Sequence, residues 1–290
     1  MVTATYRGEQ PTSSIKNMKI LHVTDLHGNV PWYHWLARES PNYDLVCISG
    51  DLIYLDDSAP RQIAEIIKVL AKIRTPLAIC SGNHDTIDAE TRGEGALWVN
   101  DLKREGVWVD GEHFELGGHK FYCHPWNPPF PSAKPDEIWI VHTPPEWSVV
   151  SWGGNYGDMG DPEFAQLCGM MRGPRMALCG HAHNPPAWNA MMGRTHVFNP
   201  GHASGASVPA HIIFDLSLGV ATRYYPDRPH AIVPIGSVSA KDILRKRSSE
   251  DLERLIDLTV QNQKAEGHVL TSEEIAEVRR RLRELAFGDE

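Results

Sequence analysis

The sequence lacks long apolar runs, paired cysteine motifs and an excess of basic residues. No stretch approaches the roughly 18 uninterrupted apolar residues of a membrane-spanning helix, so no membrane association is expected. Residues 1–17 are polar and have no apolar segment after a basic start, which argues against a signal peptide and predicts a loose N-terminal extension. The 28 Lys and Arg residues against 37 Asp and Glu give a net charge of −9, which argues against a broad nucleic-acid-binding surface.

Cysteines are few, and their spacing shows no pairing. The 5 cysteines form no CxxC motif, and Cys47, Cys80 and Cys179 lie within apolar runs. This favours buried, reduced thiols and a cytoplasmic location. A length of 290 residues with 41% apolar and 22% charged residues is typical of one large globular domain or two small ones. The 15 histidines are the unusual feature, and they direct attention to metal binding.

Short apolar segments alternate with helix-like ones in the first half of the chain. Residues 19–24, 45–49 and 77–81 are brief, rich in Val, Ile and Leu, and typical of buried strands. Residues 61–73 carry apolar side chains at helical spacing. This β–α–β order predicts an α/β domain with parallel strands. Further strands are expected at residues 113–116 and 120–123, which would form a hairpin, and at 138–141, 176–179, 195–198, 211–216 and 220–225.

The composition changes near residue 239. Charged residues of both signs replace the strand pattern, and a capping box at residues 271–274 precedes a helical face of Ile275, Val278, Leu282 and Leu285. The sequence therefore predicts a main domain over residues 18–238 and a C-terminal helical appendage over residues 239–290. This appendage is either a dimerisation or partner-docking arm, which would make a homo-oligomer, or a pair of helices packed on its own domain.

Five short polar motifs each follow a predicted strand. They are Asp-Leu-His-Gly-Asn at 25–29, Gly-Asp at 50–51, Gly-Asn-His-Asp at 82–85, a histidine at 142 and Gly-His-Ala-His at 180–183. Each motif supplies oxygen or nitrogen metal ligands at a strand end, which is where ligands bind in α/β sheets. The glycines allow the backbone to turn sharply beside the ligands.

The order of these motifs resembles the calcineurin-like metallophosphoesterase superfamily. This resemblance implies that residues 18–238 fold as a four-layer α/β/β/α sandwich, with a two-metal centre at one edge. It implies a first metal held by Asp25, His27 and His183, a second held by Asn83, His142 and His181, and Asp51 as the bridge between them. A donor set without thiolate suits Mn²⁺, Fe or Zn²⁺ better than Mg²⁺ or Ca²⁺. Mn²⁺ is the ion expected to support activity in vitro.

The same resemblance implies a mechanism. Two metals about 3.5–4 Å apart would bridge a water and lower its pKa, so that a hydroxide attacks the phosphate in line. Asp51 would act through its bridging position, and His84 resembles the histidine that protonates the leaving group. Asp57, or its neighbour Asp56, resembles the acid that orients this histidine, with Asp85 as the alternative.

A second, narrower resemblance covers residues 121–128 and 142–145. There, Pro-Trp-Asn-Pro precedes His-Thr-Pro-Pro, as in a small phosphodiesterase branch that includes the brain-expressed mammalian members. This resemblance implies a preference for phosphodiesters and nucleotide binding, with His124 or Trp126 in the wall of the substrate pocket. The alternative for Trp126 is packing as a lid over the core. Residues 199–201 resemble the family's Asn-Pro-Gly turn, and His202 beside it is a candidate to enter the site.

The expected function is hydrolysis of small phosphate esters. Phosphodiesters of the nucleotide type are expected as substrates in preference to monoesters. Phosphomonoesterase, protein phosphatase and nuclease are the enzymatic alternatives. Leu52 and Thr86 stand near positions where protein phosphatases carry arginines that hold phosphate, which argues against a protein phosphatase. The acidic net charge argues against a nuclease. A non-catalytic protein-binding scaffold is the alternative from another class.

Overall fold

The computed structural model describes residues 18–87, 96–126, 129–134, 136–226 and 228–236, together with 271–273, 275–276 and 279–280. The expected extension over residues 1–17 lies outside this part of the chain, as does most of the appendage over residues 239–290. The described residues 272–273, 275–276 and 279–280 are helical, at the place where the capping box predicts a helix. The domain boundaries and the oligomeric role of the appendage stay predictions.

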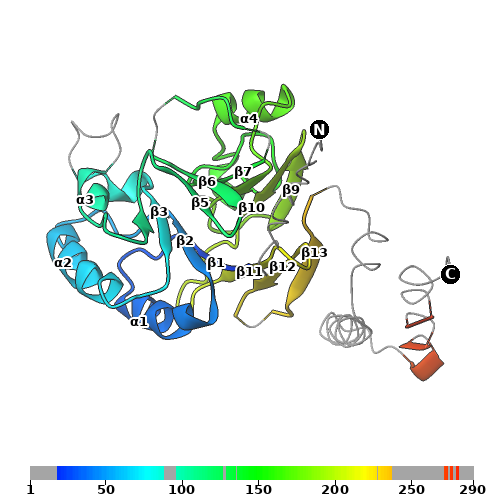
Figure 1. The fold of residues 1–290 in the computed structure, drawn as a ribbon, viewed down its shortest axis with the longest axis horizontal. Helices are drawn as coiled ribbons and strands as arrows, with labels where there is room; N and C mark the ends of the chain where they lie inside the picture. Colours follow the sequence, from blue (N-terminus) through cyan, green and yellow to red (C-terminus); the bar gives the residue numbers. More distant parts are fainter. Residues whose placement is uncertain are drawn as a thin grey trace, which may run out of the picture.

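Two mixed sheets form the framework (Figure 1). The first sheet has seven strands in the order β13 (Ala231–Pro234), β12 (Val220–Tyr224), β11 (His211–Asp215), β1 (Lys19–Val23), β2 (Leu45–Ser49), β3 (Leu77–Cys80) and β4 (Val107–Trp108). The second has six, in the order β5 (His113–Leu116), β6 (His119–His124), β7 (Glu137–Val141), β8 (Met176–Leu178), β10 (Thr195–Phe198) and β9 (Asn189–Met192).

Parallel pairing dominates the centre of each sheet, as the β–α–β order predicts. The strands β1, β2, β3 and β4 are parallel neighbours, and so are β6, β7, β8 and β10. The predicted hairpin is present as the antiparallel pair β5–β6, and the predicted strands β11 and β12 also pair antiparallel. Because parallel strands point the same way, their carboxyl ends gather at one edge of each sheet.

Helices cover the outer faces of the two sheets. The helices α1 (Val30–Glu39), α2 (Ala59–Leu70) and α3 (Leu97–Asn100) lie on the side of the first sheet, and α4 (Pro162–Gly169) lies on the side of the second (Figure 1). The short 3₁₀ turns are η1 (Ser40–Asn42), η2 (Asn83–Asp85) and η4 (Gly154–Tyr156). None of the described helices is long and apolar enough to span a lipid bilayer.

Alternate residues of each strand enter different layers of the core. Val46 and Ile48 of β2 pack in one cluster with Trp32 of α1, whereas Leu45 and Cys47 belong to a second cluster between the sheets. A third cluster joins the outer face of the second sheet to α4, with Trp139, Phe164 and Cys168 among its members. The layers are therefore helix, sheet, sheet and helix, which confirms the predicted four-layer sandwich. All five cysteines are buried and free, as predicted.

Candidate metal centre

All seven predicted ligands come together where five strands end. Asp25 and His27 follow β1, Asp51 follows β2, and Asn83 begins η2 after β3. His142 follows β7, and His181 and His183 follow β8. These loops bring carboxylate, amide and imidazole donors from both sheets to the same edge of the sandwich.

Four of the donors form one tight group. Single ligand atoms of Asp25, His27, Asp51 and His183 all lie within 4.8 Å of one another. The Nε2 atoms of His27 and His183 are 3.0 Å apart, and Nε2 of His183 is 3.4 Å from Oδ1 of Asp25. Two imidazole nitrogens and two carboxylates that converge on one point fit a divalent transition metal.

The remaining donors form a second group on the other side of Asp51. Nε2 of His142 lies 3.2 Å from Oδ1 of Asn83 and 3.3 Å from Oδ1 of Asp51. The ring of His181 lies 5.1 Å from that of His142. Because Oδ2 of Asp51 faces His27 at 3.7 Å while its Oδ1 faces His142, this carboxylate occupies the position of a bridge between two groups.

The backbone at the donors is strained, as expected at a functional site. Six described residues other than glycine have a positive φ, and four of them are predicted ligands. Their φ values are +51° at Asp25, +42° at His27, +52° at Asp51 and +67° at His181. This left-handed region is costly for such side chains, so strain concentrated on the donors fits a role that requires their placement.

Two glycines allow the loops to approach one another closely. A Cβ atom at Gly82 would collide with the carboxylate of Asp51, and one at Gly180 would collide with Thr24 and with the carboxylate of Asp25. Any larger residue would displace a donor, because these neighbours are buried at the centre of the site.

Burial and charge set the protonation of the donors. Burial lowers the pKa of His27 and of His181 to about 4, so both rings are neutral at neutral pH. Burial also opposes the charged form of His142, but the charge and hydrogen bond of Asp51 raise the pKa of His142 to about 9. Burial alone would raise the pKa of Asp25, yet its hydrogen bond with His183 and the nearby imidazoles hold it below the usual value. Metal binding there replaces protons.

Hydrogen bonds behind the donors orient their rings. Nδ1 of His142 donates to the carbonyl of Ser49 at 2.7 Å, which turns Nε2 toward the centre. His202 donates from Nδ1 to the carbonyl of Asp25 at 2.8 Å, and its ring stacks on His183 at 4.6 Å. His202 thus enters the site behind the first group of donors.

His84 lies beside the centre, but the expected acids do not orient it. Nδ1 of His84 accepts a hydrogen bond from the backbone N–H of Leu55 at 3.3 Å. The carboxylate of Asp56 accepts instead from Ser58 and Gln62, and no hydrogen bond joins Asp57 to His84. The expected contact with Asp56 or Asp57 is therefore not formed in this structure. A nitrogen that accepts from a backbone N–H is unprotonated, so it has no proton to give a carboxylate.

Asp85 does not face His84 either. The Asp85 side chain is buried and accepts from the backbone N–H groups of Leu52, Ile53 and Gly82 at 2.9, 3.1 and 2.8 Å. It ties the loop that carries Asp51 to the loop that carries Asn83. The sequence does show an Asp directly after the Asn-His ligand motif. Its hydrogen-bond partners are backbone N–H groups, which the sequence does not reveal.

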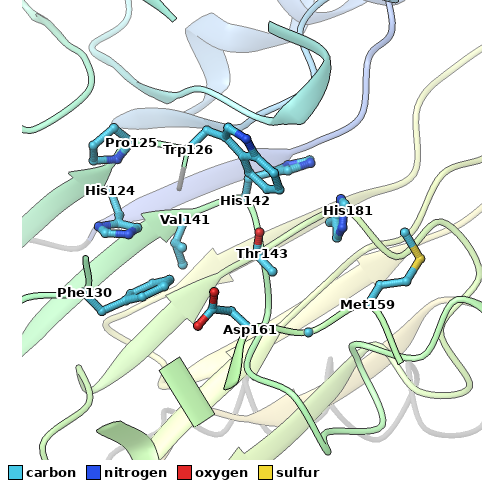
Figure 2. Close-up of a pocket in the computed structure, with 11 residues that line it drawn as sticks. His124, Pro125, Trp126, Phe130, Val141, His142, Thr143, Met159, Asp161 and His181 are labelled. Atoms are coloured by element: carbon cyan, nitrogen blue, oxygen red, sulfur yellow. The ribbon is translucent and has the colours of Figure 1, made fainter. Parts of the chain in front are cut away.

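The predicted substrate residues lie next to the second group of donors (Figure 2). Trp126 lies 5.7 Å from the ring of His142 and 5.6 Å from that of His181. His124 and Trp126 line a cavity of about 170 Å³, which we call the inner pocket. A larger cavity of about 400 Å³, the outer pocket, is lined by His84, Tyr156, Asn184 and several donors.

The fold and the donor set define the class of protein: a four-layer α/β sandwich with a candidate metal centre at its strand ends. The family model of the calcineurin-like phosphoesterases matches residues 18–185, a range that includes all seven donors. The chain therefore belongs to the calcineurin-like phosphoesterase family and is a metal-dependent hydrolase of phosphate esters, as the motif order predicts.

Solved structures that match this chain include a plant phosphatase, a bacterial protein and an archaeal phosphodiesterase. The purple acid phosphatase PPD1 of yellow lupin (Lupinus luteus) is 14% identical, with a TM-score of 0.52 over 82% of this chain and 56% of that one. The TT1561 protein of Thermus thermophilus is 16% identical, with a TM-score of 0.48 over 76% and 100% of the two chains. The archaeal phosphodiesterase is 15% identical, with a TM-score of 0.43 over 75% and 99%. A search of curated proteins gives no match.

Proposed function

We propose that the protein is a binuclear metallophosphoesterase that hydrolyses small phosphodiesters, nucleotide diesters among them, in preference to monoesters. The observation that carries the proposal is the bridging position of Asp51, whose two oxygens face separate groups of donors. One ion would be held by Asp25, His27, Asp51 and His183, and the other by Asp51, Asn83, His142 and His181. Mn²⁺ is the ion we expect to support activity in vitro, with Fe and Zn²⁺ as alternatives.

Metal ions supply charge neutralisation and an activated water when they are bound at such a centre. The chain's own contribution is to hold its donor side chains in one arrangement around the centre. The Asp51 carboxylate also accepts the backbone N–H of His84 at 2.8 Å, which couples the position of the bridge to that of the neighbouring histidine.

His84 is placed to transfer a proton to the leaving oxygen. Its ring lines the outer pocket and lies 4.8 Å from the ring of His27. Because Nδ1 accepts the N–H of Leu55, Nε2 is the nitrogen that carries a proton toward the pocket. The step we assign to His84 is proton donation from the imidazolium: a solvent proton on Nδ1 would replace the Leu55 contact, Nε2 would give its proton to the developing alkoxide, and the ring would return to its neutral form.

The preference for diesters is supported by the two cavities that adjoin the centre. His181 and Met159 line both the inner and the outer pocket, so the two spaces meet at the donors. A diester carries an organic group on each side of its phosphate, and each group would find a pocket. Neither pocket is lined by a Lys or Arg among the described residues, although a monoester dianion would gain from such a charge.

The test compares hydrolysis of bis(p-nitrophenyl) phosphate and p-nitrophenyl phosphate by the Mn²⁺-loaded protein. We expect the diester to react faster, Asp51→Asn to abolish both reactions, and His84→Ala to lower the rate by about 100-fold or more. A much faster monoester reaction would favour a phosphomonoesterase or a protein phosphatase. No turnover by a folded, metal-loaded protein would favour a protein-binding scaffold. The net charge of −9 still disfavours a nuclease.

We place the enzyme in the cytoplasm, because its five cysteines are all buried free thiols.

A further inference from the structure

A loop with exposed aromatic side chains lies beside the outer pocket. Residues 145–161, which we call the rim loop, connect β7 to α4. Three aromatic side chains of this loop are left in water: Trp147 is 77% exposed, Trp152 is 43% exposed and Tyr156 is 86% exposed. Large apolar groups gathered in water next to a pocket indicate a contact surface rather than a part of the core.

Tyr156 is the exposed aromatic residue of the rim loop that lines the outer pocket. It borders this cavity of about 400 Å³ together with His84 and Asn184 and with several metal donors. At 86% exposure the residue lies at the mouth of the cavity, and the faces of its ring are free to contact a ligand. Trp147 does not line this pocket, although it belongs to the same loop.

The turn that carries Tyr156 has a fixed shape. Gly154 and Gly157 have φ values of +64° and +75°, which glycine adopts without strain. The N–H of Gly153 donates to the carbonyl of Gly157 at 2.8 Å and closes the turn. A Cβ atom at Gly153 would collide with the sulfur of Met159, so the turn packs directly against a residue that lines both pockets.

One buried amide ties the rim loop to a donor loop. Nδ2 of Asn199 lies 3.1 Å from the carbonyl oxygen of Val150, a buried residue of the rim loop. The same nitrogen lies 2.9 and 3.0 Å from the carbonyl oxygens of Gly180 and Ala182, in the loop that carries two of the donors. Because this link exists before a substrate enters, a contact with Tyr156 would cost little ordering of the chain.

The position of His84 indicates which part of the substrate lies in the outer pocket. His84 lines this pocket, and its Nε2 is the atom to which we assign protonation of the leaving oxygen. The organic group on that oxygen therefore extends into the outer pocket. There it meets the flat face that Tyr156 presents at the mouth.

We propose that Tyr156 stacks on an aromatic leaving group of the substrate. The rim loop then selects phosphodiesters whose leaving oxygen carries a planar ring, either an aryl group directly or a nucleobase through its sugar. The proposal rests on the proposed function, since it names one organic group of the phosphodiester. Stacking needs only a flat face and is tolerant of the ring's identity, whereas an alkyl chain offers no such face.

The test measures binding of diphenyl phosphate and dibutyl phosphate to the Mn²⁺-loaded protein by isothermal titration calorimetry. Both are phosphodiesters with two apolar groups, but only diphenyl phosphate has flat rings. Tyr156→Ala should lower the affinity for diphenyl phosphate about tenfold and that for dibutyl phosphate by twofold at most. Tyr156→Phe keeps the ring and should bind both ligands as the wild-type protein does.

The matched control is Trp147→Ala, which removes an exposed ring of the same loop outside the pocket. This variant should bind both ligands within twofold of the wild-type protein. Equal changes for the two ligands in Tyr156→Ala, no change for either, or the same loss in Trp147→Ala would overturn the proposal.

Kinetics distinguish the two sources of an aromatic leaving group. A rise in KM of about tenfold for thymidylyl-(3′→5′)-thymidine in Tyr156→Ala identifies a nucleoside, and a rise for bis(p-nitrophenyl) phosphate alone identifies an aryl group. An unchanged KM for both substrates counts against Tyr156. Turnover without a selective loss of affinity in Tyr156→Ala refutes only the assignment of Tyr156. A selective loss of affinity without turnover by the wild-type protein refutes only the enzymatic function.

Discussion

Replacement of Asp85 should destabilise the protein in graded steps, because this buried carboxyl joins two ligand loops. In Asp85→Ala, the N–H groups of Leu52, Ile53 and Gly82 lose their acceptor at once. An unsatisfied buried N–H costs about 1–3 kcal/mol, so three would cost about 3–9 kcal/mol. Burial and the nearby Asp51 charge raise the pKa of Asp85, because both disfavour the charged form of its carboxyl. Removal of the carboxyl relieves this unfavourable interaction and offsets part of the lost stability. We expect a net loss of about 4 kcal/mol.

Asp85→Asn is the informative intermediate. Its oxygen can still accept from Leu52 and Ile53, but its NH₂ group would face the N–H of Gly82, so a loss of about 1–2 kcal/mol is expected. The assay is urea unfolding of the metal-free protein, followed by tryptophan fluorescence, with unchanged m values as the sign that only stability has changed.

The control for Asp85 is Asp56→Ala. Asp56 also accepts a backbone N–H, from Ser58 at 2.8 Å, but it is exposed, so its loss should leave the unfolding midpoint close to that of the wild-type protein. Equal unfolding midpoints for the Ala and Asn variants of Asp85, or a loss below about 1 kcal/mol for the Ala variant, would refute the role of Asp85 as a brace.

Three further outcomes follow from the structure. Burial lowers the pKa of His22 and of His124 to about 3, so between this value and the unfolded pKa of about 6.5 only the unfolded chain takes up these protons. When the pH falls from 7.5 to 5, each histidine should lower the free energy of unfolding by about 2 kcal/mol, as measured by urea titration. His124→Phe should abolish the loss that comes from His124. Removal of metal with EDTA should stop hydrolysis and lower the melting temperature, and Mn²⁺ at 100 times its dissociation constant should return about 2.7 kcal/mol. Gly180→Ala should weaken Mn²⁺ binding in calorimetry through collision with Asp25, whereas Gly169→Ala, which meets no atom within 4 Å, should bind Mn²⁺ normally.

Much of the centre is predictable because its donors follow strand ends directly. A strand that is brief and apolar identifies its own end, and parallel strands bring those ends to one edge. This local rule puts Asp25, Asp51 and His142 at strand ends, where the structure has them, without any knowledge of the packing. The same rule places β1, β2 and β3, whose observed bounds differ from the predicted ones by at most one residue.

Features that depend on tertiary contacts were beyond the sequence. The partner of His84 is the backbone N–H of Leu55, and every residue type except proline offers that group, so no side-chain pattern could indicate it. The inner pocket requires Phe130 and Trp126 to be held by α4 and Ser81, which are distant in sequence. Helix α1, by contrast, had a usable signal: Asn29 accepts the N–H of Trp32 as its N-cap, and Pro31 follows in the first turn.

The arrangement of the ligand loops indicates that the fold builds the centre, and that metal ions complete it. Strand pairing continues past β1 and β2 into the ligand loops, where the N–H of Asp25 donates to Gly50 at 3.1 Å and that of His27 to Asp51 at 2.9 Å. Across the second sheet, the N–H of Gly180 donates to the carbonyl of His142 at 2.9 Å. These bonds hold the four left-handed donor residues, whose strain costs on the order of 1 kcal/mol or more each. Three packed clusters under the loops offset that strain. Metal removal should therefore lower stability through lost binding alone, and the metal-free protein should still unfold in one cooperative transition.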